Sequence, residues 1–466
     1  MSTNRPAILG GPPQRTRPFI VTPMIDDEEE RLVVEAIRNH DFSRYIGSSS
    51  PDIDTILKMP SQEAANIDAD WHFLGGPNVR QFAGTFAEKF NTPFAIPVNS
   101  ATSGLSVALA ANDIGAGDEV IVPALSFTAT GSSILLFNAI PVFVDVDPRT
   151  YCLDPEAVER AITPKTRALL PVHLLGNACD MDALCAIAER HDLKIIEDCA
   201  QAPGTRFKGN YVGTIGNAGV FSFQQSKNIM TGEGGMIITS DPYVAARARM
   251  IINHGEAVTT SDWSDEELSN VIGCNFRLPE LCAALGRAQL DKLDTVNAWR
   301  NENYRILVDG LGSLPGFTAP YIPQTVDFIC HVAGFLYDAT ETGLSRDLFL
   351  AAVRAEGIPM GTGYTRLMYE NPTFLRRIAY GVNGSPWTDG SEPSTVTYAH
   401  GQCPVAEALI GEQFLWMYHI AHPSTADDMS DVIKAVEKVI CHADKIKSRE
   451  SDILNHGQGG RSQGRL

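Results

Sequence analysis

Between about residue 76 and residue 240, short and almost uninterrupted apolar segments alternate with segments of helical periodicity. The apolar segments include DEVIVP, IPVFVDV, RALLPVHLL and LKIIED, and the helical ones include DPEAVERAI and DMDALCAIAERHD. Strands that are apolar throughout are buried on both faces, and helices between them supply the crossovers of a parallel sheet. The sequence therefore predicts an α/β fold with a mostly parallel sheet flanked by helices.

Composition and periodicity divide the chain into four segments. Residues 1–75 form an N-terminal segment, in which Phe42–Gly76 has no clear period and is predicted to be an irregular lid or binding excursion. Residues 76–308 are predicted to form the large domain, ending in one long helix over Pro279–Leu307. Residues 309–445 are predicted to form a smaller α+β domain, and the polar residues 446–466 a disordered tail.

The charge and the cysteines exclude several classes of protein. A net charge of −19 over 466 residues disfavours binding to nucleic acid or to an anionic membrane. The first residues lack the apolar core of a signal peptide, and no stretch approaches the roughly eighteen apolar residues of a membrane span. The nine cysteines are scattered without zinc-site spacing. We therefore expect no metal, and reduced thiols in a cytoplasmic protein.

One lysine lies in an unusual place. Lys227 falls in SFQQSKNIMTGEGG, residues 222–235, between the apolar segments GVFSF and MIITS. The glycines that follow permit tight backbone approaches. A lysine fixed between two core strands is either a phosphate clamp or a nucleophile.

Polar residues follow the predicted strands, where ligands bind in sheets of this class. Because the carboxyl ends of parallel strands meet at one edge, we expect these residues to lie along one rim. They are Asn99–Gly104, Ser126, Phe127, His173, Glu197–Gln201, Ser222 and Lys227.

This set of groups fits one cofactor. The helix that opens at Ser100 offers free N–H groups to a phosphate, and Phe127 offers a flat face to an aromatic ring. Asp198 can keep a ring nitrogen protonated, and Lys227 can form a Schiff base with an aldehyde. Together they describe a site for pyridoxal 5'-phosphate (PLP). Lys227 and Asp198 are the predicted catalytic residues, with the Lys227 amine as nucleophile and then general base.

The motifs GGPPQRTRP, EDCAQA and SFQQSKNIMTGEGG together resemble those of the sugar and cyclitol aminotransferases, which are PLP enzymes of the aspartate-aminotransferase fold, or fold type I. The subgroup to which the chain is most similar contains the amino-hydroxybenzoate synthases and the scyllo-inosose aminotransferases. The resemblance covers most of the chain. It implies a seven-stranded type of sheet in the large domain.

The resemblance also implies roles for further residues. It places Gln201 near the phenolic oxygen of the PLP ring, Phe127 against the ring, and the phosphate at Ala101, Thr102 and Ser222. In the segment Gly273–Arg277, which matches the GxNxR motif, it implies that Asn275 reaches the phosphate of the neighbouring subunit. A homodimer with shared active sites would follow. Ser100-Ala101-Thr102 departs from the usual Ser-Gly-Thr turn, and the excursion Phe42–Gly76 is longer than in the family.

The expected activity is transfer of an amino group from glutamine or glutamate to a keto-sugar or keto-cyclitol in secondary-metabolite biosynthesis. A PLP-dependent dehydratase, a synthase of an aminated aromatic ring, and a PLP-binding regulator without turnover are the alternatives. Lys227 favours amino transfer, because dehydratases of this family carry histidine there. His331 matches the usual start of the small domain. His173 is equally consistent with a core histidine and with a rim residue.

Overall fold

The computed structural model describes residues 4–45, 53–66, 72–255, 271–389 and 393–457. A seven-stranded sheet forms the centre of the larger domain, in the order β1-β9-β8-β5-β4-β2-β3. Within it β9 alone runs antiparallel to its neighbours, so the predicted, mostly parallel sheet is confirmed. The strands are β1 (Phe94–Val98), β2 (Glu119–Pro123), β3 (Ile140–Val144), β4 (Thr166–Leu169), β5 (Lys194–Asp198), β8 (Ala218–Ser222) and β9 (Gly235–Thr239).

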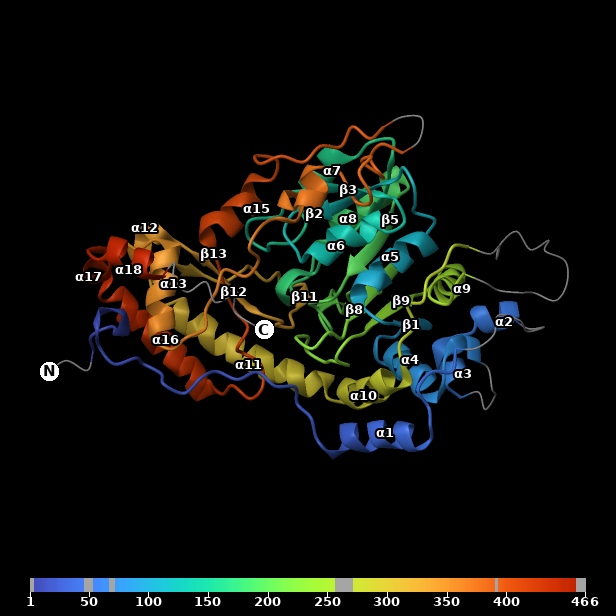
Figure 1. The fold of residues 1–466 in the computed structure, drawn as a ribbon, viewed down its shortest axis with the longest axis horizontal. Helices are drawn as coiled ribbons and strands as arrows, with labels where there is room; N and C mark the ends of the chain where they lie inside the picture. The colour runs from blue at the N-terminus through green and yellow to red at the C-terminus, as the bar shows by residue number, and fades with distance from the viewer. Residues whose placement is uncertain (1–3, 46–52, 67–71, 256–270, 390–392, 458–466) are drawn as a thin grey trace.

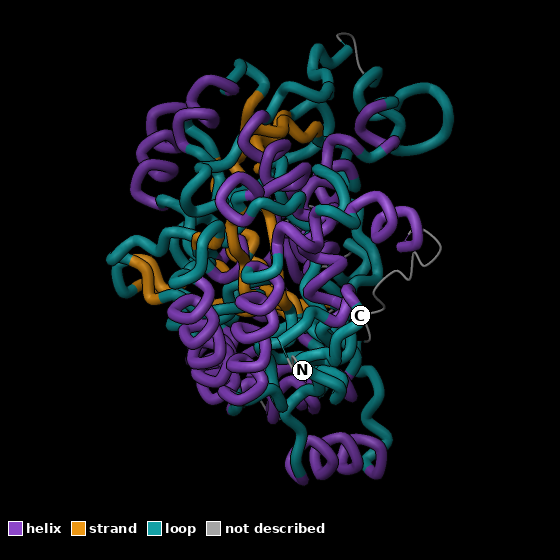
Figure 2. The backbone as a smooth tube through the Cα atoms, turned by 90° about the vertical axis from the view of Figure 1, so that its left-hand side faces the viewer, coloured by secondary structure: helices purple, strands orange, loops and turns teal. Residues whose placement is uncertain are grey.

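Helices cover both faces of this sheet, as Figure 1 and the side view in Figure 2 show. Every residue of β1, β2, β8 and β9 is buried, which is the physical reason for their uninterrupted apolar sequences. No helix in the described ranges is both long and apolar enough to cross a membrane. The helices of this domain are α4 (Pro77–Lys89), α5 (Ala101–Ala111), α6 (Thr128–Leu135), α7 (Pro155–Ala161), α8 (Met181–His191) and α9 (Pro242–Ile251).

The long helix predicted over Pro279–Leu307 is two helices. α10 spans Glu280–Asp291 and α11 spans Leu293–Leu311, and Lys292 lies between them. Lys292 Nζ donates hydrogen bonds to the Glu29 carboxylate of α1 (Asp27–Arg38), at 2.6 and 2.7 Å. Figure 1 shows α10 and α11 in yellow, running end to end between the two domains.

The small domain has its own core, built on the antiparallel sheet β10-β12-β13. Its strands are β10 (Phe317–Thr318), β12 (Ala333–Tyr337) and β13 (Phe414–Met417), and its helices include α12 (Ala339–Thr342), α13 (Arg346–Ala355) and α16 (Ala426–Ile440). A third sheet, β11-β6-β7, joins β11 (Val326–Asp327) to β6 (Arg206–Phe207) and β7 (Asn210–Tyr211).

Residues 367–409 return from the small domain to the large one, which differs from the predicted division at residue 309. Tyr398 Oη donates to the Pro141 carbonyl of β3 at 2.7 Å, and the N–H groups of Val405 and Ala406 donate to the Asp145 carboxylate. The segment therefore covers β3, an edge strand that would otherwise be exposed. Its helices are η4 (Met368–Glu370), α14 (Pro372–Leu375) and α15 (Pro404–Ala408).

The N-terminal segment is bound to the small domain through a buried carboxylate. Glu356 accepts hydrogen bonds from the N–H groups of Ala7 and Gln14, each at 2.7 Å, and from Lys438 Nζ at 2.9 Å. Arg15 pairs with Asp428 at 2.7 Å. The GGPPQRTRP motif thus has a structural role. From there the segment runs beneath α11 to α1 (Figure 1).

The prediction of a disordered tail is wrong for residues 446–457. Ile446 is fully buried in the core of the small domain, at the end of α17 (Ala443–Lys447). α18 (Glu450–Gly457) follows, and the Glu450 carboxylate accepts a hydrogen bond from Ser345 Oγ at 2.9 Å. Ile453 of α18 also packs against this core, so two apolar residues order a sequence that is otherwise polar. Residues 458–466 lie outside the described residues.

We expect Gly235→Ala to lower the free energy of unfolding by about 1–3 kcal/mol, the usual cost of forcing an extra group into a packed site. A Cβ at Gly235 would lie 2.8 Å from both the Ala101 nitrogen and the Ser100 carbonyl carbon, where α5 meets β9. Chemical denaturation measures the loss. Gly411→Ala is the control, because no atom lies within 4 Å of its Cβ position. Equal losses in the two variants would contradict the prediction.

Candidate active site

The N-terminus of α5 lies just beyond the carboxyl end of β1. Ser100 is its N-cap, and Ser100 Oγ accepts a hydrogen bond from the Ser103 N–H at 3.2 Å. The N–H groups of Ala101 and Thr102 have no intrahelical acceptor because they belong to the first turn. Ser222 pairs with Gly235, whose backbone lies against Ala101. The three residues predicted to hold phosphate therefore lie close together at a terminus suited to anions.

Asp198 ends β5 and is 4% exposed. Its carboxylate accepts hydrogen bonds from Thr130 Oγ1 at 2.9 Å and from the Ala200 N–H at 3.1 Å. Burial raises the Asp198 pKa, and the two hydrogen bonds and the Lys227 ammonium oppose that shift without cancelling it. Asp198 is therefore a carboxylate that gains from a cationic partner in the site.

Lys227 lies in a turn after β8, where its N–H donates to the Gln224 carbonyl at 2.8 Å. The turn is closed by the Gln225 N–H, which donates to the Gly232 carbonyl at 2.9 Å. Burial lowers the pKa of the Lys227 amine to about 8. The Asp198 carboxylate opposes this shift and the Arg300 guanidinium adds to it. A substantial fraction of the amine is therefore neutral near physiological pH.

Residues from the small domain hold both neighbours of Lys227. Tyr418 Oη donates to the Ser226 carbonyl, and the His331 ring and the Asn228 amide oxygen are 3.0 Å apart. Arg300 on α11 donates to the His331 carbonyl at 2.6 Å. Burial first, then the Lys227 and Arg300 cations, keep the His331 pKa well below its usual value. His331 is consequently a neutral hydrogen-bonding partner.

Gln201 is buried beside Asp198 and makes two hydrogen bonds. Its Oε1 accepts from the Leu175 N–H at 2.9 Å, and its Nε2 donates to Tyr364 Oη at 2.7 Å. Leu175 has a left-handed backbone, with φ of 58°, and its carbonyl accepts from the His331 N–H at 3.0 Å. A strained backbone at such a position is typical of a functional site. The predicted cofactor role of Gln201 stays a prediction.

Phe127 is the N-cap residue of α6 and is 63% exposed, which is unusual for a phenylalanine. The first turn of α6 carries Thr130, which bonds both Ser126 and Asp198. Phe127 is thereby placed near the Asp198 carboxylate with a ring that is open to a ligand. Stacking on a cofactor ring stays a prediction.

Asn275 is exposed and lies in a segment that crosses the rim. The Asn99 N–H donates to the Phe276 carbonyl at 2.8 Å, which fixes this segment beside the start of α5. Arg277 Nε donates to Asn275 Oδ1 at 2.9 Å. Contact of Asn275 with a second chain stays a prediction.

His173 is a core histidine rather than a rim residue. Its Nδ1 accepts from the Cys179 N–H at 3.2 Å, so the ring proton is on Nε2, which lies 3.0 Å from the Glu197 carboxylate. His173, Glu197 and Cys199 have potential metal ligands within 4.8 Å of one another. However, Glu197 also accepts hydrogen bonds from three backbone N–H groups, those of Gly213, Ile215 and Gly216. Its oxygens are therefore occupied.

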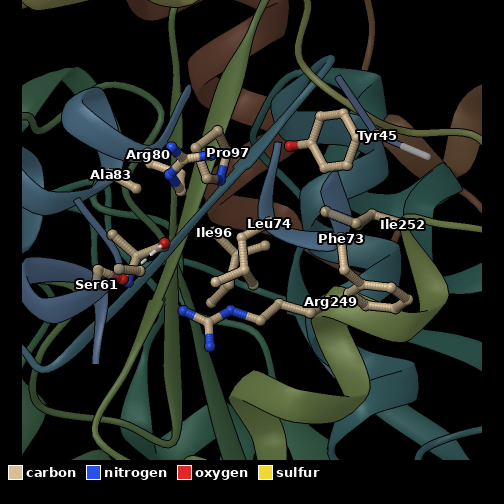
Figure 3. A pocket seen from close by; sticks show the side chains of 12 residues that line it. Tyr45, Ser61, Phe73, Leu74, Arg80, Ala83, Ile96, Pro97, Arg249 and Ile252 are labelled. Carbon is tan, nitrogen blue, oxygen red and sulfur yellow. Dashed lines mark hydrogen bonds between the residues drawn. The ribbon is translucent and has the colours of Figure 1, made fainter. Parts of the chain in front are cut away.

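The described part of the excursion Phe42–Gly76 packs behind β1, where Figure 3 shows a cavity. Arg249 lines it and donates to the carbonyls of Ile56, Leu57 and Met59 at 3.3, 2.7 and 2.8 Å. The cavity holds about 20 Å³, which suits a water molecule and not a substrate. Neither Lys227 nor Asp198 lines it. Residues 46–52 and 67–71 of the excursion lie outside the described residues.

The structure thus brings four features to one rim: the Lys227 amine, the buried Asp198 carboxylate, the N-terminus of α5 and the exposed Phe127 ring. The sequence model of the DegT/DnrJ/EryC1/StrS aminotransferase family matches residues 60–437. The chain belongs to this family and is an aminotransferase, as the sequence motifs predicted.

Relatives and solved structures agree with this assignment. The chain is 36% identical over 447 residues to the L-glutamine:2-deoxy-scyllo-inosose aminotransferase of Streptomyces lividus, covering 94% of this chain and 97% of that one. It is 47% identical over 245 residues to the L-glutamine:scyllo-inosose aminotransferase of Streptomyces griseus, covering 52% and 58%. The structure of the aminotransferase from Psychrobacter cryohalolentis superposes with a TM-score of 0.76 at 28% identity, covering 92% and 100%.

Thr130, Arg300, Tyr364 and Tyr418 belong to the site but were not predicted from the sequence. Each forms a hydrogen bond with a residue that the sequence singled out or with the residue next to it in the chain. Thr130 follows Phe127 by three residues, and a hydroxyl on the first turn of a rim helix could have indicated it. Arg300, Tyr364 and Tyr418 have no local signal, because they come from α11 and from the small domain.

We expect the Lys227 amine to react with an acylating reagent with an apparent pKa of about 8, against 10.5 for an unperturbed lysine. The protein is first stripped of small molecules, labelled across a pH series, and analysed peptide by peptide by mass spectrometry. In Asp198→Asn the apparent pKa should fall further, by up to about one unit, because the carboxylate that favours the ammonium is lost. A value near 10.5 in the wild-type protein would contradict the burial of this amine.

Proposed function

We propose that this aminotransferase uses PLP to move the amino group of glutamine to the keto group of a cyclitol, in aminoglycoside-type biosynthesis. The observation that carries the proposal is the pairing of the Lys227 amine, whose pKa is about 8, with the buried Asp198 carboxylate at one rim. The name of the Streptomyces lividus relative, which matches over 94% of this chain, supports the donor and the acceptor class.

The residues at the rim fit PLP. Its phosphate suits the α5 terminus at Ala101 and Thr102 together with Ser222, and its ring suits the exposed face of Phe127. Asp198 would hold the pyridine nitrogen, because its buried carboxylate ends β5 at this rim and is oriented by the Thr130 hydroxyl and the Ala200 N–H. When bound, PLP supplies a ring that withdraws electrons from the carbon next to the amino nitrogen.

Lys227 then acts in two ways. As a neutral amine it would condense with the aldehyde of PLP, with loss of water. Once the amino group of the donor has replaced it, the freed amine would remove the proton from the donor's α-carbon and deliver it to the cofactor. A pKa of about 8 keeps both forms populated near neutral pH. Tyr418 and His331 hold the residues on either side of Lys227, which limits the movement of the backbone that carries the amine.

A homodimer with shared sites is part of this proposal. Ile272 is 86% exposed, so its apolar side chain is available to a second chain. Asn275 is exposed in the same segment as Ile272 and is available to a second chain.

All nine cysteines are free, which fits the cytoplasm as the compartment.

The first test separates the two half-reactions. With PLP bound, glutamine should remove the visible absorbance of the lysine-linked cofactor, and scyllo-inosose should restore it. Lys227→Ala should abolish both changes, and Asp198→Asn should slow them by about 10³-fold, or about 4 kcal/mol of barrier. Wild-type protein that binds PLP but responds to no amino donor would be a regulator instead.

The second test concerns the shared site. Asn275→Asp places a negative charge where the partner's phosphate is expected, so we expect it to be inactive, as Lys227→Ala is. A mixed dimer of the two variants, isolated with two affinity tags, should recover about half of the wild-type activity, because one of its two sites is free of both changes. If the sites were not shared, each site of the mixed dimer would carry one of the two changes, and both sites would be inactive. An inactive mixed dimer would therefore contradict the shared arrangement.

A further inference from the structure

The hydrogen bonds of Gln201 fix the direction of its amide. The backbone N–H of Leu175 can only donate, so the atom that faces it at 2.9 Å must be the amide oxygen. The amide nitrogen therefore faces Tyr364 Oη at 2.7 Å and donates to it. Tyr364 uses its oxygen as an acceptor in this pair, and its own hydroxyl proton is directed elsewhere.

No described residue accepts the Tyr364 hydroxyl proton. The ring is half-buried and lies 5.8 Å from the ring of Trp416. Burial raises the Tyr364 pKa, the Gln201 hydrogen bond lowers it and the Asp198 carboxylate raises it, so that the hydroxyl stays protonated. The unused proton of a half-buried hydroxyl is available to water, or to an acceptor atom of a ligand that displaces that water.

Tyr364 lies on a segment that crosses the rim. Gly361 exchanges two backbone hydrogen bonds with Trp416 at the end of β13, and the Met368 N–H donates to the Ala124 carbonyl just after β2. Between these points the segment passes Gln201, beyond the end of β5. Thr365 and Arg366, which follow Tyr364, are exposed. The segment thus carries polar groups across the mouth of the site.

We infer that the Tyr364 hydroxyl donates a hydrogen bond to an oxygen atom of the amino acceptor, and that Tyr364 is a specificity-determining residue for hydroxyl-rich cyclic ketones. The inference rests on the proposed function. Such a ring has oxygens along its edge and C–H groups on its faces, which suit the O–H donor and the Tyr364–Trp416 aromatic pair. Once a bound ligand shuts this donor off from water, the site discriminates against ligands that lack the matching oxygen.

The test is Tyr364→Phe, which removes one oxygen and keeps the ring. The enzyme is converted to its amine-loaded form with glutamine, and its single-turnover reaction is followed across a series of scyllo-inosose concentrations, which gives the apparent Kd of the ketone. We expect binding of the ketone to weaken by about 5- to 20-fold. The absorbance of the bound cofactor and the rate of the glutamine half-reaction should stay within about twofold of wild type.

Tyr380→Phe is the matched control, because Tyr380 is 53% exposed on the segment that covers β3. It should change neither half-reaction. Unchanged binding of the ketone in Tyr364→Phe would overturn the inference. A shifted cofactor absorbance with unchanged ketone binding would also overturn it, because the hydroxyl would then serve the cofactor. Failure of the proposed function is a different result, in which wild-type enzyme accepts no amino group from glutamine.

Discussion

The burial of the Asp198 carboxylate and the Lys227 amine at one edge of the sheet is the constraint on which the rest of the structure depends. Burial raises the pKa of the acid and lowers the pKa of the base, while their mutual attraction opposes both shifts. Hydrogen bonds and opposite charge nearby favour the charged form of each group. The hydroxyl of Thr130 and the backbone of Ala200 supply that support to Asp198.

The position of Lys227 depends on both domains. The large domain supplies the turn from Gln224 to Gly232, and the small domain and α11 hold the residues on either side. Asn228 Nδ2 donates to Asn297 Oδ1 of α11 at 2.8 Å, and Asn297 Nδ2 donates to the Pro203 carbonyl at 2.8 Å. The lysine loop and the loop after β5 are therefore joined through one side chain. A change in the domain interface would move the amine as well.

The family membership and the site agree at the level of chemistry. The family model spans most of the chain, and the seven-stranded sheet pairs β5, which ends in Asp198, with β8, which leads into the turn of Lys227. The excursion Phe42–Gly76 was predicted to be an irregular lid or binding excursion, but its described part packs behind β1, and a role in binding stays a prediction. The segment from Gly361 to Met368 is the stronger candidate, because it crosses the rim beside Gln201.

The sequence by itself determined the sheet and the local motifs. A strand buried on both faces must be apolar throughout. Asp198 is the last residue of β5, the Ser100–Thr102 turn begins two residues after β1, and Lys227 lies five residues after β8. Only the tertiary structure decided the partners of these residues. Tyr364 and Tyr418 bond to positions 163 and 192 residues away, and a core contact at Ile446 orders part of the tail. Periodicity reports which face of a segment is buried. It carries no record of which distant segment covers that face, because such contacts depend on how whole domains pack.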